Sequence, residues 1–252
     1  MSVPDYNQWG QPVGPLVTDW QTRPFPQRGT LAGRSCRLEP LDVAAHADDL
    51  YRANAADDGR MWTYLACGPF STPEEYRAWM QHFVEDRSLV SFAIVDAATA
   101  HAIGVAAYLR ITPEQGTIEV GHLAFSPALQ RTVAATEAMA LMMDHVFDDL
   151  GYRRYEWKCN ALNTPSRQAA ARLGFRYEGT FRQAIVVKGR SRDTAWFAVT
   201  DGEWPRLRDA FAEWLDPANF DAGGRQRQAL SALTAQARVA LDAGAGPGQR
   251  RE

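Results

Sequence analysis

The most constraining feature of this sequence is a strand pattern, a helix pattern and a second strand pattern that follow one another without a long break. Residues 116–125 alternate apolar and polar side chains, and Pro127 ends the run. Residues 131–150 repeat apolar side chains at helical spacing and end at Gly151, and 155–159 again have a strand pattern. The pattern predicts one β-α-β crossover within a sheet.

Elsewhere the patterns predict hairpins. The turn Pro-Glu-Gln-Gly at 113–116 separates two strand patterns and indicates a hairpin. The other expected strands are 34–39, 90–96, 102–111, 175–184 and 194–200, and the other expected helices are 42–55, 72–86, 164–173, 204–215 and 225–241. Many hairpins with one crossover predict an α+β fold: a mixed, largely antiparallel twisted sheet with helices on both faces.

The organisation along the chain has four expected parts. They are an irregular N-terminal arm (1–32), one sheet domain (33–200), a C-terminal helical extension packed on the domain (201–241) and a disordered tail (242–252). Trp9, Trp20 and Phe25 predict that the arm is pinned to the body, because a free tail rarely carries aromatic side chains. The helix at 225–241 has an apolar stripe, which we expect to pack on its own domain rather than on a second copy in a homodimer.

The composition excludes several classes of protein. The 252 residues include 46% hydrophobic and 23% charged side chains with a net charge of −3, so the chain is neither wholly disordered nor a typical nucleic-acid binder. No apolar run is long enough to cross a membrane, and the N-terminus does not resemble a secretory signal. Cys36, Cys67 and Cys159 are far apart in the sequence, so no disulfide framework or metal site is expected and the cytoplasm is the expected location.

Two local patterns bear on ligands. Residues 38–150 hold 17 Asp and Glu against 6 Lys and Arg, whereas 151–192 hold 10 Lys and Arg against 2 Asp and Glu. This asymmetry suits an anionic ligand on one side and a cationic one on the other. The apolar stripe of the 131–150 helix is expected to be core rather than a cofactor site; it consists of Met139, Met142, Met143, Val146, Phe147 and Leu150.

The start of the same helix, residues 130–136, follows a strand directly. Free backbone N–H groups and the helix dipole make such a place an anion site, and Arg131 and Thr132 could add donors. By itself, however, this segment is better explained as an ordinary helix start. Asn163 and Ser166 stand at the next helix start, where each alone would be a capping residue.

Taken in order, the motifs resemble the GNAT N-acetyltransferase superfamily in its RimJ/RimL-like branch. The matching pieces are Arg37-Leu-Glu-Pro-Leu41, Ile118-Glu-Val-Gly121, Thr136-Glu-Ala138, Asn163-x-x-Ser166, Leu173-Gly-Phe175, Glu178-Gly179 and Arg192-Asp193. The resemblance implies that acetyl-CoA, without a metal, lies between the strands at 117–125 and 155–159. The cofactor residues that it implies are Leu123, Ala124, Phe125, Gln130, Arg131, Thr132, Val133, Ala134, Ala135, Thr136, Asn163, Ser166 and Arg167.

One departure from the family pattern lies in the expected pyrophosphate loop. The family usually has a glycine where this chain has Val133, and glycine lets the backbone approach a phosphate closely. Val133 would therefore have to turn its side chain into the core, and weakened CoA binding is the alternative.

The resemblance also implies direct attack of an amine on the thioester. Glu119 is the first candidate for the general base and His122 the second. Strand alternation predicts that only one of them faces the cleft. Ser166 is the candidate that assists the leaving thiolate. For Glu119 a structural hydrogen bond or ion pair is an equally good explanation. For His122 a structural role is the better explanation, and for Ser166 helix capping competes with the catalytic role but is compatible with it.

The acceptor is expected to contact the loop after the first helix, through Asp58, Trp62 and Tyr64. Surface acids and core aromatics are the alternative explanation for these residues. The favoured function is N-acetylation of a primary amine of a small molecule. Acetylation of a protein N-terminus, as in the ribosomal-protein branch, a non-catalytic acyl-CoA-binding module and an interaction role of the C-terminal helix are the alternatives.

Overall fold

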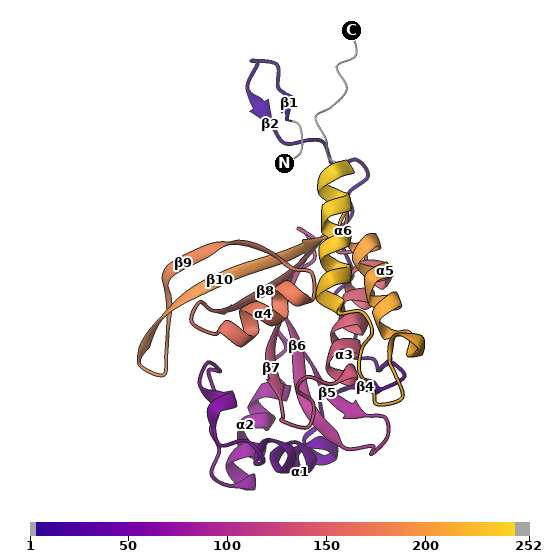
Figure 1. Ribbon diagram of the computed structural model, residues 1–252. Helices are drawn as coiled ribbons and strands as arrows, with labels where there is room; N and C mark the ends of the chain where they lie inside the picture. The colour runs from indigo at the N-terminus through magenta and orange to yellow at the C-terminus, as the bar shows by residue number, and fades with distance from the viewer. Residues whose placement is uncertain (1–3, 245–252) are drawn as a thin grey trace.

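The computed structural model describes residues 4–244 (Figure 1). The strands are β1 (Asp5–Tyr6), β2 (Pro12–Val13), β3 (Leu31–Ala32), β4 (Cys36–Pro40), β5 (Val90–Asp96), β6 (Ala102–Thr112), β7 (Thr117–Phe125), β8 (Arg154–Asn160), β9 (Arg176–Val187) and β10 (Arg190–Thr200). The helices are α1 (Val43–Asn54), α2 (Pro73–Glu85), α3 (Val133–Asp144), α4 (Thr164–Arg172), α5 (Trp204–Leu215) and α6 (Leu230–Gly244). A π-helical turn, His145–Asp149, continues α3.

Eight strands form one sheet in the order β3-β4-β5-β6-β7-β8-β10-β9. Neighbours are antiparallel except β7 and β8, which are parallel and are joined through α3. The crossover expected from the sequence is therefore confirmed, as is the mixed, largely antiparallel sheet. Within residues 4–244, no helix is long and apolar enough to cross a membrane.

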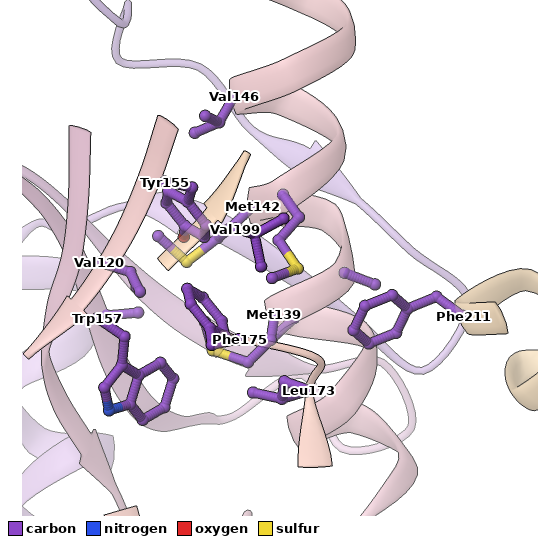
Figure 2. Close-up of a cluster of buried hydrophobic side chains, with 14 of the residues drawn as sticks. Val120, Met139, Met142, Val146, Tyr155, Trp157, Leu173, Phe175, Val199 and Phe211 are labelled. Atoms are coloured by element: carbon purple, nitrogen blue, oxygen red, sulfur yellow. The ribbon is translucent and has the colours of Figure 1, made fainter. Parts of the chain in front are cut away.

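Helices cover both faces of the sheet (Figure 1), and each face has its own hydrophobic core. α1 and α2 close one core through Leu50, Tyr76 and Met80. α3 and α5 close the other, where Figure 2 shows Met139 and Met142 of α3 near Tyr155 and Phe175 of the sheet side. All six side chains of the expected apolar stripe on this helix are buried, which confirms that the stripe is core.

The hairpin of β9 and β10 is longer than the sequence pattern predicts. Residues of β9 are exposed along almost its whole length, so the strand lacks the in-and-out alternation that reveals a half-buried strand. Its turn has Lys188 and Gly189 at φ +49° and +71°, the two positive values of a type I′ turn. The hairpin reaches well beyond the rest of the sheet in Figure 1.

The C-terminal helix begins at Leu230, five residues later than expected. Asp221 Oδ1 accepts from the backbone N–H of Arg225, and Asn219 Oδ1 accepts from that of Gln228. Such side-chain bonds compete with helix formation. Leu230 and Leu233 are buried in the core that includes α5, so the stripe packs on its own chain. Of the expected tail, residues 245–252 lie outside the described residues.

The N-terminal arm contacts the body at Trp20, whose indole N–H donates to the Glu114 carbonyl oxygen at 2.9 Å. Trp9 is 74% exposed, so the expectation that it pins the arm is wrong, and Phe25 is 41% exposed. The arm forms a small hairpin of β1 and β2 rather than a wholly irregular segment.

Candidate active site

The site begins where β7 and β8 stop pairing. The two strands are register partners up to Val120 and Trp157. Beyond this point β7 stays paired with β6, while β8 stays paired with β10. Strands that diverge leave backbone groups on their inner edges without strand partners. A cavity of about 1650 Å³ occupies this opening and extends to the starts of α3 and α4.

A β-bulge in β7 changes which side chains reach the cavity. His122 and Leu123 stand opposite the single residue Ala106 of β6, and His122 has a φ of +51°. A bulge breaks the alternation of side chains along a strand and re-aims one of them. The prediction that only one of Glu119 and His122 faces the cleft is therefore wrong, since both line the cavity.

Glu119 lies within a chain of alternating charges that crosses three strands. Nη1 of Arg110 lies 2.8 Å from both carboxylate oxygens of Glu119, and Nζ of Lys158 lies 2.8 Å from Oε2. Lys158 also lies 2.7 Å from Oε2 of Glu156, and Arg154 Nε lies 2.6 Å from the other oxygen of Glu156. Both oxygens of Glu119 therefore already accept hydrogen bonds from cations, which is the ion-pair role weighed for it.

His122 differs from Glu119 in having free ring nitrogens. Among the described residues its imidazole makes a ring contact with Phe83, at 4.8 Å between centroids, but no hydrogen bond or ion pair. Loss of solvent around the ring, and then the charge of Arg110, lower the pKa of His122 from 6.5. The imidazole is consequently neutral at neutral pH and can accept a proton.

The start of α3 has the capped N-terminus and free backbone N–H groups that an anion site requires. Thr132 is the N-cap, and its Oγ1 accepts from the backbone N–H of Ala135 at 3.1 Å. The N–H groups of Val133 and Ala134 precede the first helical hydrogen bond and stay available. Arg131, with φ +63°, lines the cavity beside them.

Val133 does not distort this helix start. It is the first residue of α3 and has no positive φ, so its conformation does not require glycine. Its side chain is partly buried against the core, as expected for the departure from the family pattern. The left-handed conformation falls two residues earlier, at Arg131.

The start of α4 brings together the second group of predicted residues. Asn163 Oδ1 caps the helix by accepting from the Ser166 N–H at 3.1 Å. Ser166 Oγ accepts from the indole N–H of Trp157 at 3.0 Å. Burial raises the pKa of Cys159, against the effect of its hydrogen bond with Ser166. These four residues line the cavity.

The remaining predicted cofactor residues divide into two groups. Leu123, Phe125, Gln130, Thr132, Val133, Ala135 and Thr136 line the cavity. Ala124 and Ala134 are buried in the two cores instead. Arg167 lies outside the cavity lining, where it donates to the Ala161 carbonyl oxygen at 3.3 Å. Arg172, five residues further along α4, lines the cavity and donates to Thr136 Oγ1 at 3.1 Å.

The expected acceptor residues are also divided. Tyr64 lines the cavity, but Trp62 and Asp58 do not. Trp62 is a core residue packed edge-on against Phe70, and Asp58 forms an exposed ion pair with Arg60. The core-aromatic and surface-acid explanations therefore describe Trp62 and Asp58.

Two contacts join separate elements near the part of the cavity that Tyr64 lines. The Tyr64 hydroxyl donates to the Leu162 carbonyl oxygen at 3.2 Å, which joins the loop after α1 to the loop before α4. Lys188, at the tip of the β9–β10 hairpin, donates to the Trp62 carbonyl oxygen at 2.8 Å. The hairpin and the two loops are therefore joined to one another on this side of the cavity.

The cavity does not carry the acidic bias of residues 38–150. Its acidic lining residues are Asp57 and Glu119, and its Arg and Lys lining residues are Arg60, Arg110, Arg131, Lys158, Arg172 and Arg192 among those the structure describes. Many acids of that segment, such as Asp48 and Glu75, lie on α1 and α2 at the surface instead. The charge of the whole lining therefore gives no support for a cationic acceptor, and that expectation stays a prediction.

Lys158, Arg172 and Trp196 are among the lining residues that were not assigned a cavity role from the sequence. The Arg-Glu-Lys alternation at 154, 156 and 158 of β8 was the available signal, because alternate residues share a face. No signal in the sequence places Trp196 there, since that depends on how the long hairpin curves. Within residues 4–244, no cluster of His, Cys, Asp or Glu could hold a metal ion.

Known proteins share this architecture. The family described as Acetyltransferase (GNAT) domain matches residues 36–176. A crystal structure of a GCN5-related N-acetyltransferase from Brucella melitensis is 45% identical, covers 87% of this chain and 100% of its own, and has a TM-score of 0.85. The N-acetyltransferase p20 of Bacillus licheniformis is 28% identical over 58% of this chain and 84% of its own length.

A structure of RimL, the ribosomal L7/L12 alpha-N-protein acetyltransferase, covers 68% of this chain and 94% of its own at a TM-score of 0.59. Its identity is 20%, so this likeness is one of fold. The splayed strands and the match to the family domain lead to the same conclusion: the chain belongs to the GNAT acetyltransferase family and is an acyltransferase.

Proposed function

We propose that this protein transfers an acetyl group from acetyl-CoA to a primary amine of a small molecule. The main support is one continuous cavity. It runs from the free N–H groups at the start of α3, along the opening between β7 and β8, to the part lined by Tyr64, which bonds across to Leu162. Such a cavity suits a long anionic donor at one end and a small acceptor at the other.

The donor would bind along residues that already have the required groups. Backbone N–H groups of Val133 and Ala134, with Arg131, suit the pyrophosphate. The inner edge of β7 beyond Val120 suits the amides of the pantetheine arm, because its backbone groups have no partner from β8. On α4, Arg172 rather than Arg167 is the proposed contact to the CoA phosphates, because Arg172 lines the cavity and Arg167 does not.

His122 is the proposed general base. The acceptor amine must lose a proton to attack, and the neutral imidazole has a free nitrogen to receive it, directly or through water. The amine nitrogen then bonds to the thioester carbon, the carbon–sulfur bond breaks and CoA leaves as a thiolate that takes up a proton. Unpaired N–H groups at the bulge are the proposed donors to the transient oxyanion, and Ser166 the proposed hydrogen-bond donor to the leaving sulfur.

The contacts across the proposed acceptor end favour a small amine as the substrate rather than a protein N-terminus. A peptide requires an open groove, whereas here Tyr64 and Lys188 bridge the walls. From the resemblance to the RimJ/RimL-like branch we therefore take the fold and the use of acetyl-CoA, but not a protein substrate. We place the reaction in the cytoplasm, where the free thiols of Cys36, Cys67 and Cys159 remain reduced.

The test has two steps. Calorimetric titration with acetyl-CoA and with CoA measures donor binding, and a thiol-release assay then measures turnover with a panel of small amines and with peptides bearing free N-termini. Micromolar binding and turnover with small amines support the proposal. Binding without turnover of any amine would favour the non-catalytic acyl-CoA-binding module, and turnover of peptides alone would favour the N-terminal acetyltransferase.

A further inference from the structure

The acceptor end of the cavity contains a cation without a counter-charge. Arg192 of β10 lines the cavity, and its Nε is buried with no hydrogen-bond partner. Among the described residues it makes no ion pair, although it lies near enough to Glu119 and Arg110 for their charges to influence its pKa. Burial of an unpartnered guanidinium N–H is costly, so such an arrangement is typical of a site that a ligand completes.

The neighbouring cations do not share this property. Lys158 is neutralised by Glu119 and Glu156 at 2.8 and 2.7 Å, and its ammonium also lies 3.7 Å from the centre of the Trp196 ring. Arg110 is paired with Glu119. The two positive charges of Lys158 and Arg110 balance the two negative charges of the glutamates. The positive charge of Arg192 is therefore in excess.

A second unsatisfied donor lies on the same face of the same strand. Trp196 is four residues beyond Arg192, so the two share a face of β10, and both line the cavity. The indole Nε1 of Trp196 is also buried without a hydrogen-bond partner. Its ring is held by stacking on Phe181 at 4.5 Å and by Lys158, so the N–H is fixed in direction.

We propose that the acceptor is an amine that also carries a carboxylate, bound by Arg192 and further hydrogen-bonded by the Trp196 indole N–H. A carboxylate is favoured over a phosphate because one uncompensated guanidinium matches a single negative charge. The Arg192 site lies near Glu119 on the acceptor side, whereas the start of α3 is the proposed site for the donor's phosphates. This inference rests on the proposed acetyl transfer and specifies its substrate class.

The first experiment compares acceptors that differ in one group. Thiol release is measured with glycine, β-alanine and 4-aminobutyrate, and with the carboxamide of each. The wild-type protein is expected to have a kcat/KM at least about tenfold higher for one or more of the acids than for the matching amide, the size typical of a charged hydrogen bond. Arg192→Gln should reduce that ratio to about threefold or less, mainly through KM.

Arg190→Gln is the matched control, since Arg190 is exposed on the same strand outside the cavity lining; it should keep the preference. Trp196→Phe keeps the aromatic ring and should weaken the preference less than Arg192→Gln.

A second readout does not depend on turnover. The matching N-acetyl amino acid, added with CoA, should raise the Tm of the wild-type protein and of Arg190→Gln but not that of Arg192→Gln. Equal turnover of acids and amides, with no difference between the variants, would overturn the carboxylate inference and leave acetyl transfer standing. Absence of donor binding and of turnover with every amine would overturn both.

Discussion

Nζ of Lys158 lies 2.8 Å from Oε2 of Glu119, and the two side chains are only 7% and 4% exposed. They come from neighbouring strands, β8 and β7, just where the parallel pair opens. The pair therefore gives Glu119 a structural role in the cavity wall. A variant of Glu119 can show whether the residue also has a catalytic role.

Glu119→Gln is expected to lower the free energy of unfolding by about 2–3 kcal/mol, because a buried ammonium loses one of its two carboxylates. Urea unfolding measures this loss. Glu178→Gln, which breaks the more exposed pair with Arg154, should cost less than about 1 kcal/mol. If Glu119→Gln kept full stability but lost the acidic limb of the kcat/KM profile, Glu119 rather than His122 would be the base.

His122→Gln is expected to lower kcat/KM by about 100-fold, within the usual contribution of a general base. In the wild-type protein kcat/KM should fall as the pH drops through a value below 6.5, because the pKa of His122 is lowered and only the neutral ring accepts a proton. The variant should lack this limb. His82→Gln, at an exposed position of α2, should keep it, and an unchanged profile in His122→Gln would exclude the imidazole.

Val133→Gly tests the departure from the family pattern. Because Val133 is already in a helical conformation and its side chain packs on the core, glycine should change the Kd for CoA by less than about threefold and destabilise the protein by about 1 kcal/mol. Calorimetry and thermal unfolding measure the two effects. A tenfold tighter Kd would show instead that the valine obstructs the phosphates.

Ser166→Ala should lower kcat by about tenfold with little change in the Kd for CoA, because it removes the proposed donor to the leaving sulfur. It also leaves the Trp157 indole N–H without its 3.0 Å partner, which should cost about 1 kcal/mol of stability. Ser191→Ala, at an exposed position of β10, is the control. A normal kcat in Ser166→Ala would leave Ser166 with a structural role alone.

Asp144, at the end of α3, links stability to pH. Burial, and then the charge of Asp148, raise its pKa from 3.8 to about 6. A raised carboxyl pKa means that the folded state holds the proton more tightly, so this contribution is complete below pH 3.8 and is lost as the pH rises through about 6.

Asp144→Asn resembles the protonated form, so it should match the wild-type stability near pH 4 and exceed it by about 1–2 kcal/mol at pH 8, a value reduced for partial exposure. Urea unfolding at several pH values measures the difference. Asp209→Asn, exposed on α5, should show no such trend. A pH-independent effect of Asp144→Asn would contradict the linkage.

The sequence by itself determined the crossover, the two-sided packing of the sheet and the capping of α3 and α4. Each depends on residues close together in the chain: the apolar repeat ending at Gly151, Thr132 before Ala135, and Asn163 before Ser166. Local spacing sets these features, because helix periods and caps act within a few residues.

Only the tertiary structure decided the character of the cavity. The bulge at His122 brings its side chain to the cavity that Glu119 also lines. The pairing of β7 with β8 brings Lys158 to the Glu119 carboxylate, and the long hairpin brings Arg192 and Trp196 to the same cavity. These groups come from separate strands, and strand register and bulges depend on long-range pairing that no short sequence pattern encodes.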